Sequence, residues 1–130
     1  MIQSLKKHHL GVVISPEKVS DIEQSFSTKF IMDIAQGARV CMVDHPHFQI
    51  PVEYIVKEGR ASNYELGFHH VCYEVKDLDE LNSFKEFLRA KKMGYRLTKL
   101  DKSPTKECNF VMFFVVHQIG IIEINIERMN

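Results

Sequence analysis

The sequence predicts an α+β fold of two tandem modules, each in the order strand–helix–strand–strand–strand. Two observations lead to this prediction. The chain contains two similar stretches, the first running from His9 to Glu53 and the second from His70 to Glu123. In both, the histidine begins a run rich in valine and isoleucine, and the glutamate lies in another such run. A repeat of about half the chain is typical of two copies of one structural unit.

Length and composition suit one compact domain over residues 1–130, with module 1 at about 7–58 and module 2 at about 67–127. Lysine and arginine together number 17, as do aspartate and glutamate, so the formal net charge is zero. This balance argues against a surface dedicated to nucleic acid or to an anionic membrane. The apolar run 110–116 is too short to span a bilayer and reads as a buried strand.

The cysteines and the first residues predict a cytoplasmic protein. The three cysteines are widely spaced and form no CxxC pair, which is typical of a reducing compartment. The first ten residues contain lysines and histidines but no apolar segment of the kind found in a signal peptide.

Module 1 should contain one short helix between its first two strands. Ser15, Pro16 and Glu17 form a helix start, with a hydroxyl at the N-cap and proline in the first turn. The apolar spacing that follows predicts a helix ending near Ser27. Strands are expected at 9–14, 30–34, 38–43 and 50–57.

Module 2 should contain a longer helix. Asp77 and Glu80 have the spacing of a capping box, and Gly94 follows a basic last turn and should close the helix. Strands are expected at 68–75, 95–100, 109–116 and 120–127, with a loop at 101–107.

Strand alternation predicts which side chains share a face. His70 lies on the face that also contains Cys72 and Glu74, opposite a more apolar face, and His9 is placed in the same way in its strand. Glu123 lies opposite an isoleucine face. A carboxylate in so apolar a strand needs a partner, because burying it alone is costly.

Two imidazoles and two carboxylates could bind one divalent metal ion, with His9, Glu53, His70 and Glu123 as the ligands. Mixed nitrogen and oxygen ligands suit Zn, Mn, Co, Fe or Ni, and four protein ligands leave positions open for water or substrate. Alternatives remain at each residue. A single strand histidine is more often satisfied by the backbone, and Pro51 suggests that Glu53 lies on a solvated edge strand. His45 and His47 are expected in a solvated loop.

These residues resemble the vicinal oxygen chelate superfamily, the group of glyoxalases, epimerases and dioxygenases. The resemblance lies in the segments 67–78 (GFHHVCYEVKDL), 121–124 (IIEI) and 52–55 (VEYI), and it is closest to methylmalonyl-CoA epimerase-like members. It implies paired βαβββ modules that form a curved mixed sheet around a metal-holding cup. It also implies metal ligands at His9, Glu53, His70 and Glu123, and commonly a homodimer.

The predicted function is that of a divalent-metal-dependent enzyme, an epimerase, isomerase or glyoxalase-type lyase. It would stabilise the enediolate formed from a small carbonyl compound, acyl thioester such as an acyl-CoA, or 2-oxo compound, with Glu123 or Glu53 as the catalytic base. Two alternatives are a non-catalytic small-molecule-binding protein of the bleomycin-resistance type and an Fe(II) dioxygenase.

Overall fold

The computed structural model describes residues 5–45, 49–102 and 110–127. It divides into two compact units, which are described in turn. The N-terminal unit comprises residues 9–69, and the C-terminal unit comprises residues 1–8 and 70–130. Both units combine a helix with a mixed sheet, so the predicted α+β class is confirmed.

The N-terminal unit is a four-stranded arrangement in the order β2-β3-β4-β1. Strand β1 pairs in parallel with β4, while β4 with β3 and β3 with β2 are antiparallel. The elements are β1 (Lys6–Ile14, in this unit from His9), η1 (Pro16–Lys18), α1 (Val19–Phe26), β2 (Ile31–Asp33), β3 (Ala38–Val43), β4 (Val52–Val56) and η2 (Gly59–Ala61).

The first helix differs from its prediction at its start and ends near Ser27 as predicted. The chain first makes the short 3-10 turn η1, and the Ser15 side chain makes no capping hydrogen bond to it. Helix α1 ends at Phe26, and Ser27 adopts the left-handed conformation with φ 50°. Proline at the first helical position therefore sets the entry of the chain into the helix without help from a serine cap.

A small apolar core holds the strands of the N-terminal unit together. Val13 lies opposite Ile55 in the pairing of β1 with β4, and both side chains are buried. They pack with three small or branched residues, Ala38, Val40 and Ala61. This core lies on the same face of β4 as Glu53, because residues two apart share a face.

The C-terminal unit has the strand order β5-β9-β8-β6, with β7 also paired to β8. Strand β5 pairs in parallel with β9, and the pairings of β8 are antiparallel. The elements are β5 (Gly67–Val75, in this unit from His70), α2 (Leu78–Lys91), β6 (Gly94–Arg96), β7 (Asp101–Lys102), β8 (Phe110–Val116) and β9 (Gly120–Ile126).

Helix α2 begins at the predicted cap and ends before the predicted glycine. The Asp77 carboxylate accepts a 3.0 Å hydrogen bond from the Glu80 backbone N–H, and the Glu80 carboxylate accepts one of 2.7 Å from the Lys76 N–H. At the other end, Lys92 takes the left-handed conformation with φ 53°. The prediction that Gly94 closes the helix was therefore wrong, and Gly94 begins β6.

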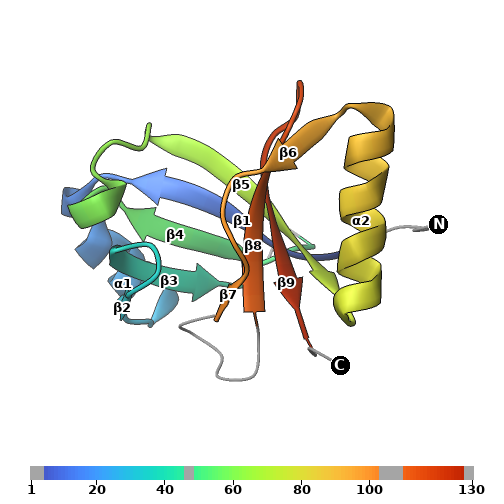
Figure 1. Ribbon diagram of the computed structural model, residues 1–130. Coiled ribbons are helices and arrows are strands. Elements are labelled where there is room, and N and C mark those ends of the chain that lie inside the picture. The colour runs from blue at the N-terminus through green and yellow to red at the C-terminus, as the bar shows by residue number, and fades with distance from the viewer. Residues whose placement is uncertain (1–4, 46–48, 103–109, 128–130) are drawn as a thin grey trace. The chain divides into compact units, whose positions relative to one another are not determined.

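The core of the C-terminal unit lies between α2 and the sheet (Figure 1). Leu81, Phe84 and Leu88 form the buried stripe of the helix, as their spacing predicts. They belong to one core with Phe114 of β8 and with the isoleucines of β9, Ile122, Ile124 and Ile126. The predicted apolar face of the last strand is therefore the face that α2 covers.

Two strands differ in extent from their predictions. The strand expected at 95–100 is the shorter β6, Gly94–Arg96, and the expected loop at 101–107 begins with the short β7. The rest of that loop, 103–109, lies outside the described residues. Within the part of the chain that the structure describes, no helix has the length and apolar character to cross a membrane.

Candidate functional site

A buried histidine–glutamate pair lies in the C-terminal unit. Glu123 is opposite Cys72 in the parallel pairing of β5 with β9, and His70, two residues before Cys72, shares its face. The Nε2 atom of His70 is 2.9 Å from Oε1 of Glu123. The imidazole is 0% exposed and the carboxylate 11% exposed, so the two groups meet in a largely dry environment.

The N-terminal unit contains an equivalent pair. Glu53 is opposite Gly11 in the parallel pairing of β1 with β4, and His9 is two residues before Gly11. The Nε2 atom of His9 lies 3.7 Å from Oε1 of Glu53, and both residues are buried. The two units therefore share one register. Glu53 pairs with Gly11, two residues after His9, and Glu123 pairs with Cys72, two residues after His70.

The position of β4 in the sheet corrects the expectation that Glu53 lies on a solvated edge strand. Pro51 suggested a solvated edge strand, but β4 lies between β3 and β1, and Glu53 is 6% exposed. Proline is tolerated here because it precedes the strand, where its carbonyl accepts a 2.9 Å hydrogen bond from the Leu10 N–H.

Gln36 is a neighbour of Glu53 that the sequence did not reveal. Its side-chain amide nitrogen lies 3.4 Å from Oε1 of Glu53 and 2.8 Å from Oδ2 of Asp33. Asp33 also accepts hydrogen bonds from the backbone N–H groups of Ala35 and Gln36, which fix the turn after β2. The turn thus holds an amide against the buried carboxylate.

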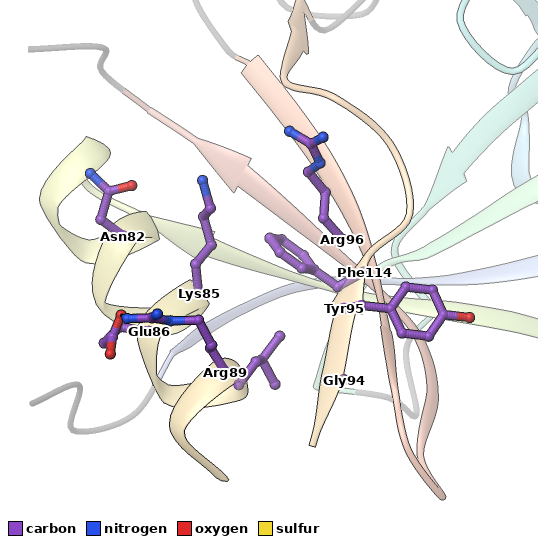
Figure 2. Close-up of a pocket in the computed structure, with 9 residues that line it drawn as sticks. Asn82, Lys85, Glu86, Arg89, Gly94, Tyr95, Arg96 and Phe114 are labelled. Carbon is purple, nitrogen blue, oxygen red and sulfur yellow. The ribbon is translucent and has the colours of Figure 1, made fainter. Parts of the chain in front are cut away.

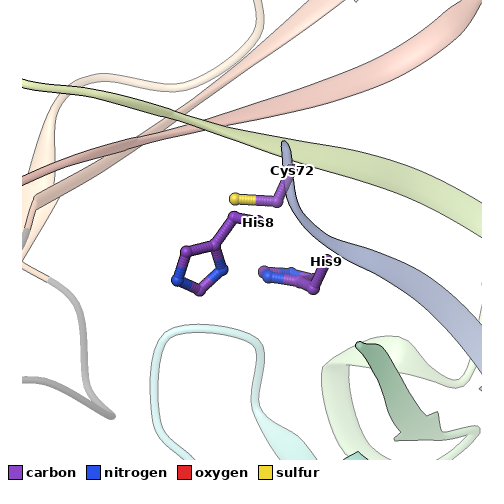
Figure 3. A group of neighbouring side chains, drawn as sticks. All are labelled: His8, His9 and Cys72. Atoms are coloured by element: carbon purple, nitrogen blue, oxygen red, sulfur yellow. The ribbon is translucent and has the colours of Figure 1, made fainter. Parts of the chain in front are cut away.

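The buried face of the C-terminal unit includes more polar groups than the pair itself. The Glu74 carboxylate lies 3.5 Å from Nζ of Lys6 and 3.9 Å from Nε2 of His8. A ring nitrogen of His8 lies within 4.8 Å of the sulfur of Cys72, a buried free thiol, and Figure 3 shows these two side chains beside each other. The strand pattern gave no sign that His8 would reach this face.

Asn125 is a buried amide on the same strand face as Glu123. The residue is 5% exposed, and Oδ1 has no hydrogen-bond partner among the described residues. Most buried polar atoms in proteins have such a partner. An orphaned acceptor on this face can receive a hydrogen bond from a water molecule or a bound ligand.

His45 lies in a packed position rather than in the solvated loop that was expected. One of its ring nitrogens is 2.6 Å from the Tyr54 hydroxyl, and its ring meets Phe26 edge-on at a centroid distance of 4.7 Å. Burial raises the pKa of the Tyr54 phenol. Because Tyr54 points to the face opposite Glu53, this contact is separate from the buried pair. His47 lies outside the described residues.

The two pairs have the chemistry of metal ligands. Each offers an imidazole and a carboxylate, a nitrogen and oxygen set that suits borderline divalent metals. Carboxylate and imidazole groups are also the side chains most used for acid–base catalysis.

The sequence matches no protein-family model and no curated protein. Solved structures nevertheless share its fold. A Streptomyces coelicolor methylmalonyl-CoA epimerase variant in complex with 2-nitronate-propionyl-CoA has a TM-score of 0.65 at 14% identity, covering 95% of this chain and 98% of that chain.

Two further structures are similar over nearly their whole length. Methylmalonyl-CoA epimerase from Mycobacterium tuberculosis has a TM-score of 0.62 at 13% identity, covering 97% of this chain and 92% of that chain. A hypothetical protein from Bacillus halodurans has a TM-score of 0.67 at 13% identity, covering 98% of both chains. The chain thus shares the α+β fold of these solved structures, which is the fold that the resemblance in its sequence implies.

Proposed function

We propose that this protein is a divalent-metal-dependent enzyme that removes and returns a proton next to a carbonyl group, an epimerase or glyoxalase-type enzyme. One observation carries the proposal. Each unit holds a buried histidine–glutamate pair at the same register of a parallel strand pair, His9 with Glu53 and His70 with Glu123. Burial of such pairs is costly, and replacing them with apolar residues is often neutral or stabilising, so their presence in both copies favours a functional role.

The donor set fits a single divalent ion, for which His9, Glu53, His70 and Glu123 would be the ligands. Two neutral imidazoles and two carboxylates balance a charge of 2+, and they leave positions open at a metal that accepts five or six ligands. A bound ion of this kind supplies Lewis-acid polarisation of a carbonyl oxygen. We infer Zn, Co, Ni, Mn or Fe from the ligand types.

The proton would be moved by one of the two glutamates. Oε1 of Glu123 lies 2.9 Å from Nε2 of His70, and Oε1 of Glu53 lies 3.7 Å from Nε2 of His9 and 3.4 Å from the Gln36 amide nitrogen. Each carboxylate is a candidate general base, so we infer that Glu123 or Glu53 accepts the proton. Removal of the α-proton would give the enolate of a thioester or the enediolate of a 2-oxo compound, and a proton delivered to the opposite face would give epimerisation.

An acyl-CoA thioester is the substrate class that we favour. The similar solved structures include an epimerase in complex with methylmalonyl-CoA and another in complex with a propionyl-CoA analogue. A thioester has the acidic α-hydrogen that such chemistry requires. Hemithioacetals and 2-oxo compounds meet the same requirement and belong in any substrate test. A cytoplasmic homodimer stays a prediction from the sequence.

Solvent exchange of the substrate α-hydrogen tests this proposal. Methylmalonyl-CoA, propionyl-CoA and a hemithioacetal would be incubated in D2O with the metal-loaded protein, and deuterium at the α-carbon would be measured by mass spectrometry. We expect metal-dependent exchange with at least one substrate. No exchange with any of them, by protein whose metal content is verified, would overturn the proposal.

Conservative variants separate the two glutamates. Glu53→Gln and Glu123→Gln both keep an oxygen ligand but remove the group that accepts the proton. We expect the variant at the catalytic base, Glu53 or Glu123, to lose exchange by about a hundredfold or more while retaining metal. Glu65→Gln, at an exposed carboxylate, is the matched control and should be unchanged. If Glu123→Gln alone lost exchange with metal retained, Glu123 would be the base.

A further inference from the structure

A groove with a volume of about 540 Å³ lies between α2 and β6 of the C-terminal unit. It is on the helix-covered face of the sheet. Phe114 lines the groove and is opposite Ile122 in the pairing of β8 with β9, whereas Phe113 is opposite Glu123. Because successive strand residues point to opposite faces, the groove is separated from the face that carries His70 and Glu123.

Two cationic side chains flank this groove. Lys85 comes from the middle of α2 and Arg96 from β6, and Figure 2 shows both extending in the same direction on either side of Phe114. No ion pair is found for either of them among the residues that the structure describes. Arg89, by contrast, is 2.6 Å from the Glu86 carboxylate, so that cation is already balanced.

The lining also includes Glu86 and Arg89, which pair with each other, together with an amide and an apolar floor. Asn82 lies on the same helix, three residues before Lys85, and its side chain projects beside it in Figure 2. Phe114 and Leu88, both buried, close the bottom of the groove. The Tyr95 ring points away from the helix and leaves the space between Lys85 and Arg96 open.

General charge effects do not account for this arrangement. The chain has no net charge, so a pair of unbalanced cations is a local feature. Lys91 and Lys92 lie at the C-terminal end of α2, where cations interact favourably with the helix dipole. Lys85 is remote from that end, and Arg96 is not on the helix.

We propose that this groove is a second binding site, for a small organic phosphate. The phosphate would lie between Lys85 and Arg96, with the Asn82 amide as a further donor. The organic part would cover the floor formed by Phe114 and Leu88. Such a phosphate has two sources, the phosphorylated end of a coenzyme A thioester and a free nucleotide.

The chemistry of the lining favours a phosphate. A phosphate monoester carries a charge close to −2 at neutral pH, which balances the two cations. The planar guanidinium of arginine forms bidentate hydrogen bonds with phosphate oxygens, and lysine adds a point charge. A groove of about 540 Å³ is within the range of about 300–1,000 Å³ for small-molecule sites.

An NMR titration of the full ¹⁵N-labelled chain tests this site without requiring catalysis. The probes are AMP, adenosine, inorganic phosphate and coenzyme A, each added in EDTA so that no metal is bound. We expect saturable AMP binding with shifts at the amides of Leu88 and Phe114. Adenosine and inorganic phosphate, each of which lacks one half of the ligand, should bind at least about tenfold more weakly, since a charge-assisted hydrogen bond is roughly twice as strong as a neutral one.

Matched variants locate the binding. Lys85→Gln and Arg96→Gln, alone and combined, should each weaken AMP binding by about tenfold or more. Lys91→Gln changes a lysine of the same helix that lies outside the groove. The affinity of this variant for AMP should stay within about twofold of that of the unmodified protein. All three side chains are exposed, so the variants should fold, which circular dichroism can verify.

Three results would overturn the proposal: no saturable AMP binding, adenosine binding as tightly as AMP, or equal AMP affinity in the combined variant and the Lys91→Gln control. Coenzyme A binding tighter than AMP, with the same loss in the combined variant, would support the thioester as the source. AMP binding tighter than coenzyme A would support a free nucleotide. Because no turnover is measured, failure of the proposed enzyme activity would leave this result standing.

Discussion

The Nε2 atom of His70 lies 2.9 Å from Oε1 of Glu123 across the parallel pairing of β5 with β9. The imidazole is fully buried, and it holds the carboxylate in place within the C-terminal unit. His9 and Glu53 have the same register relationship in the N-terminal unit. Strand geometry alone therefore gives each unit one buried nitrogen donor and one buried carboxylate.

His70→Ala should destabilise the protein even without metal. It removes the imidazole that stabilises the buried Glu123, and breaking a buried pair by removing one partner costs about 3–5 kcal/mol. We expect a loss of that size in the free energy of unfolding, measured by urea denaturation in EDTA. His117→Ala, at an exposed turn histidine, should change it by less than about 0.5 kcal/mol. Equal losses in both variants would contradict the importance of the pair.

Gln36→Ala should weaken metal binding. The Gln36 amide lies 3.4 Å from Glu53, and removing a group that orients a metal ligand typically costs about 10–100-fold in affinity. A competition titration with a chromogenic chelator measures the change. Gln24→Ala, on the exposed side of α1, is the control. An affinity equal to that of the control would show that Gln36 does not position Glu53.

Asn125→Leu should keep or raise the stability of the protein. The orphaned Oδ1 of Asn125 is buried, and replacing an unsatisfied polar group by an apolar one of similar size removes its desolvation penalty. We expect the free energy of unfolding without ligand to stay the same or rise by about 1 kcal/mol. The same variant should lose α-hydrogen exchange if the amide receives a hydrogen bond from substrate. A loss of stability would mean that Asn125 has a structural partner.

Glu58 should contribute stability that is lost in acid. Arg39 donates two side-chain hydrogen bonds to this carboxylate, of 2.9 and 2.8 Å, and its backbone N–H donates a third. The Arg39 guanidinium lowers the pKa of Glu58. The folded state therefore releases its proton at lower pH than the unfolded state, so the contribution is complete above the ordinary pKa of about 4.3 and disappears as the pH falls through the lowered value.

The pH dependence of Tm in Glu58→Gln tests this linkage. At pH 7 we expect Tm to fall by about 3 °C, the effect of about 1 kcal/mol in a chain of this size. The difference from the unmodified protein should shrink below pH 4. Glu86→Gln breaks the more exposed pair with Arg89 and should change Tm less. A Glu58→Gln effect that is independent of pH would contradict the assigned cause.

The sequence predicted the order of the elements because strand alternation, helix caps and the internal repeat all point to one arrangement. Asp77 caps α2 as its spacing with Glu80 indicates. The prediction that Gly94 closes α2 was wrong because this glycine is needed for packing between strands. A Cβ there would be 2.2 Å from the Val115 carbonyl oxygen, so glycine is required by the packing of β6 on β8 and not by the helix end.

The candidate site was predicted in part for similar reasons. Glu123 and Glu53 could be assigned to a face because each is a single carboxylate within an apolar strand. The contact of Gln36 with Glu53 depends on how the turn after β2 folds back, and the approach of His8 to Cys72 depends on pairing between distant segments. No local pattern encodes either contact. The joint role of the two pairs as ligands of one ion stays a prediction.

Metal content tests the central claim most directly. Untagged protein would be analysed by inductively coupled plasma mass spectrometry after remetallation, beside a His70→Ala, Glu123→Ala variant and a His9→Ala, Glu53→Ala variant. If the two pairs share one ion, the unmodified protein should hold close to one metal per chain, and each double variant should hold almost none. Equal metal in all three proteins, or none in any of them, would contradict the account.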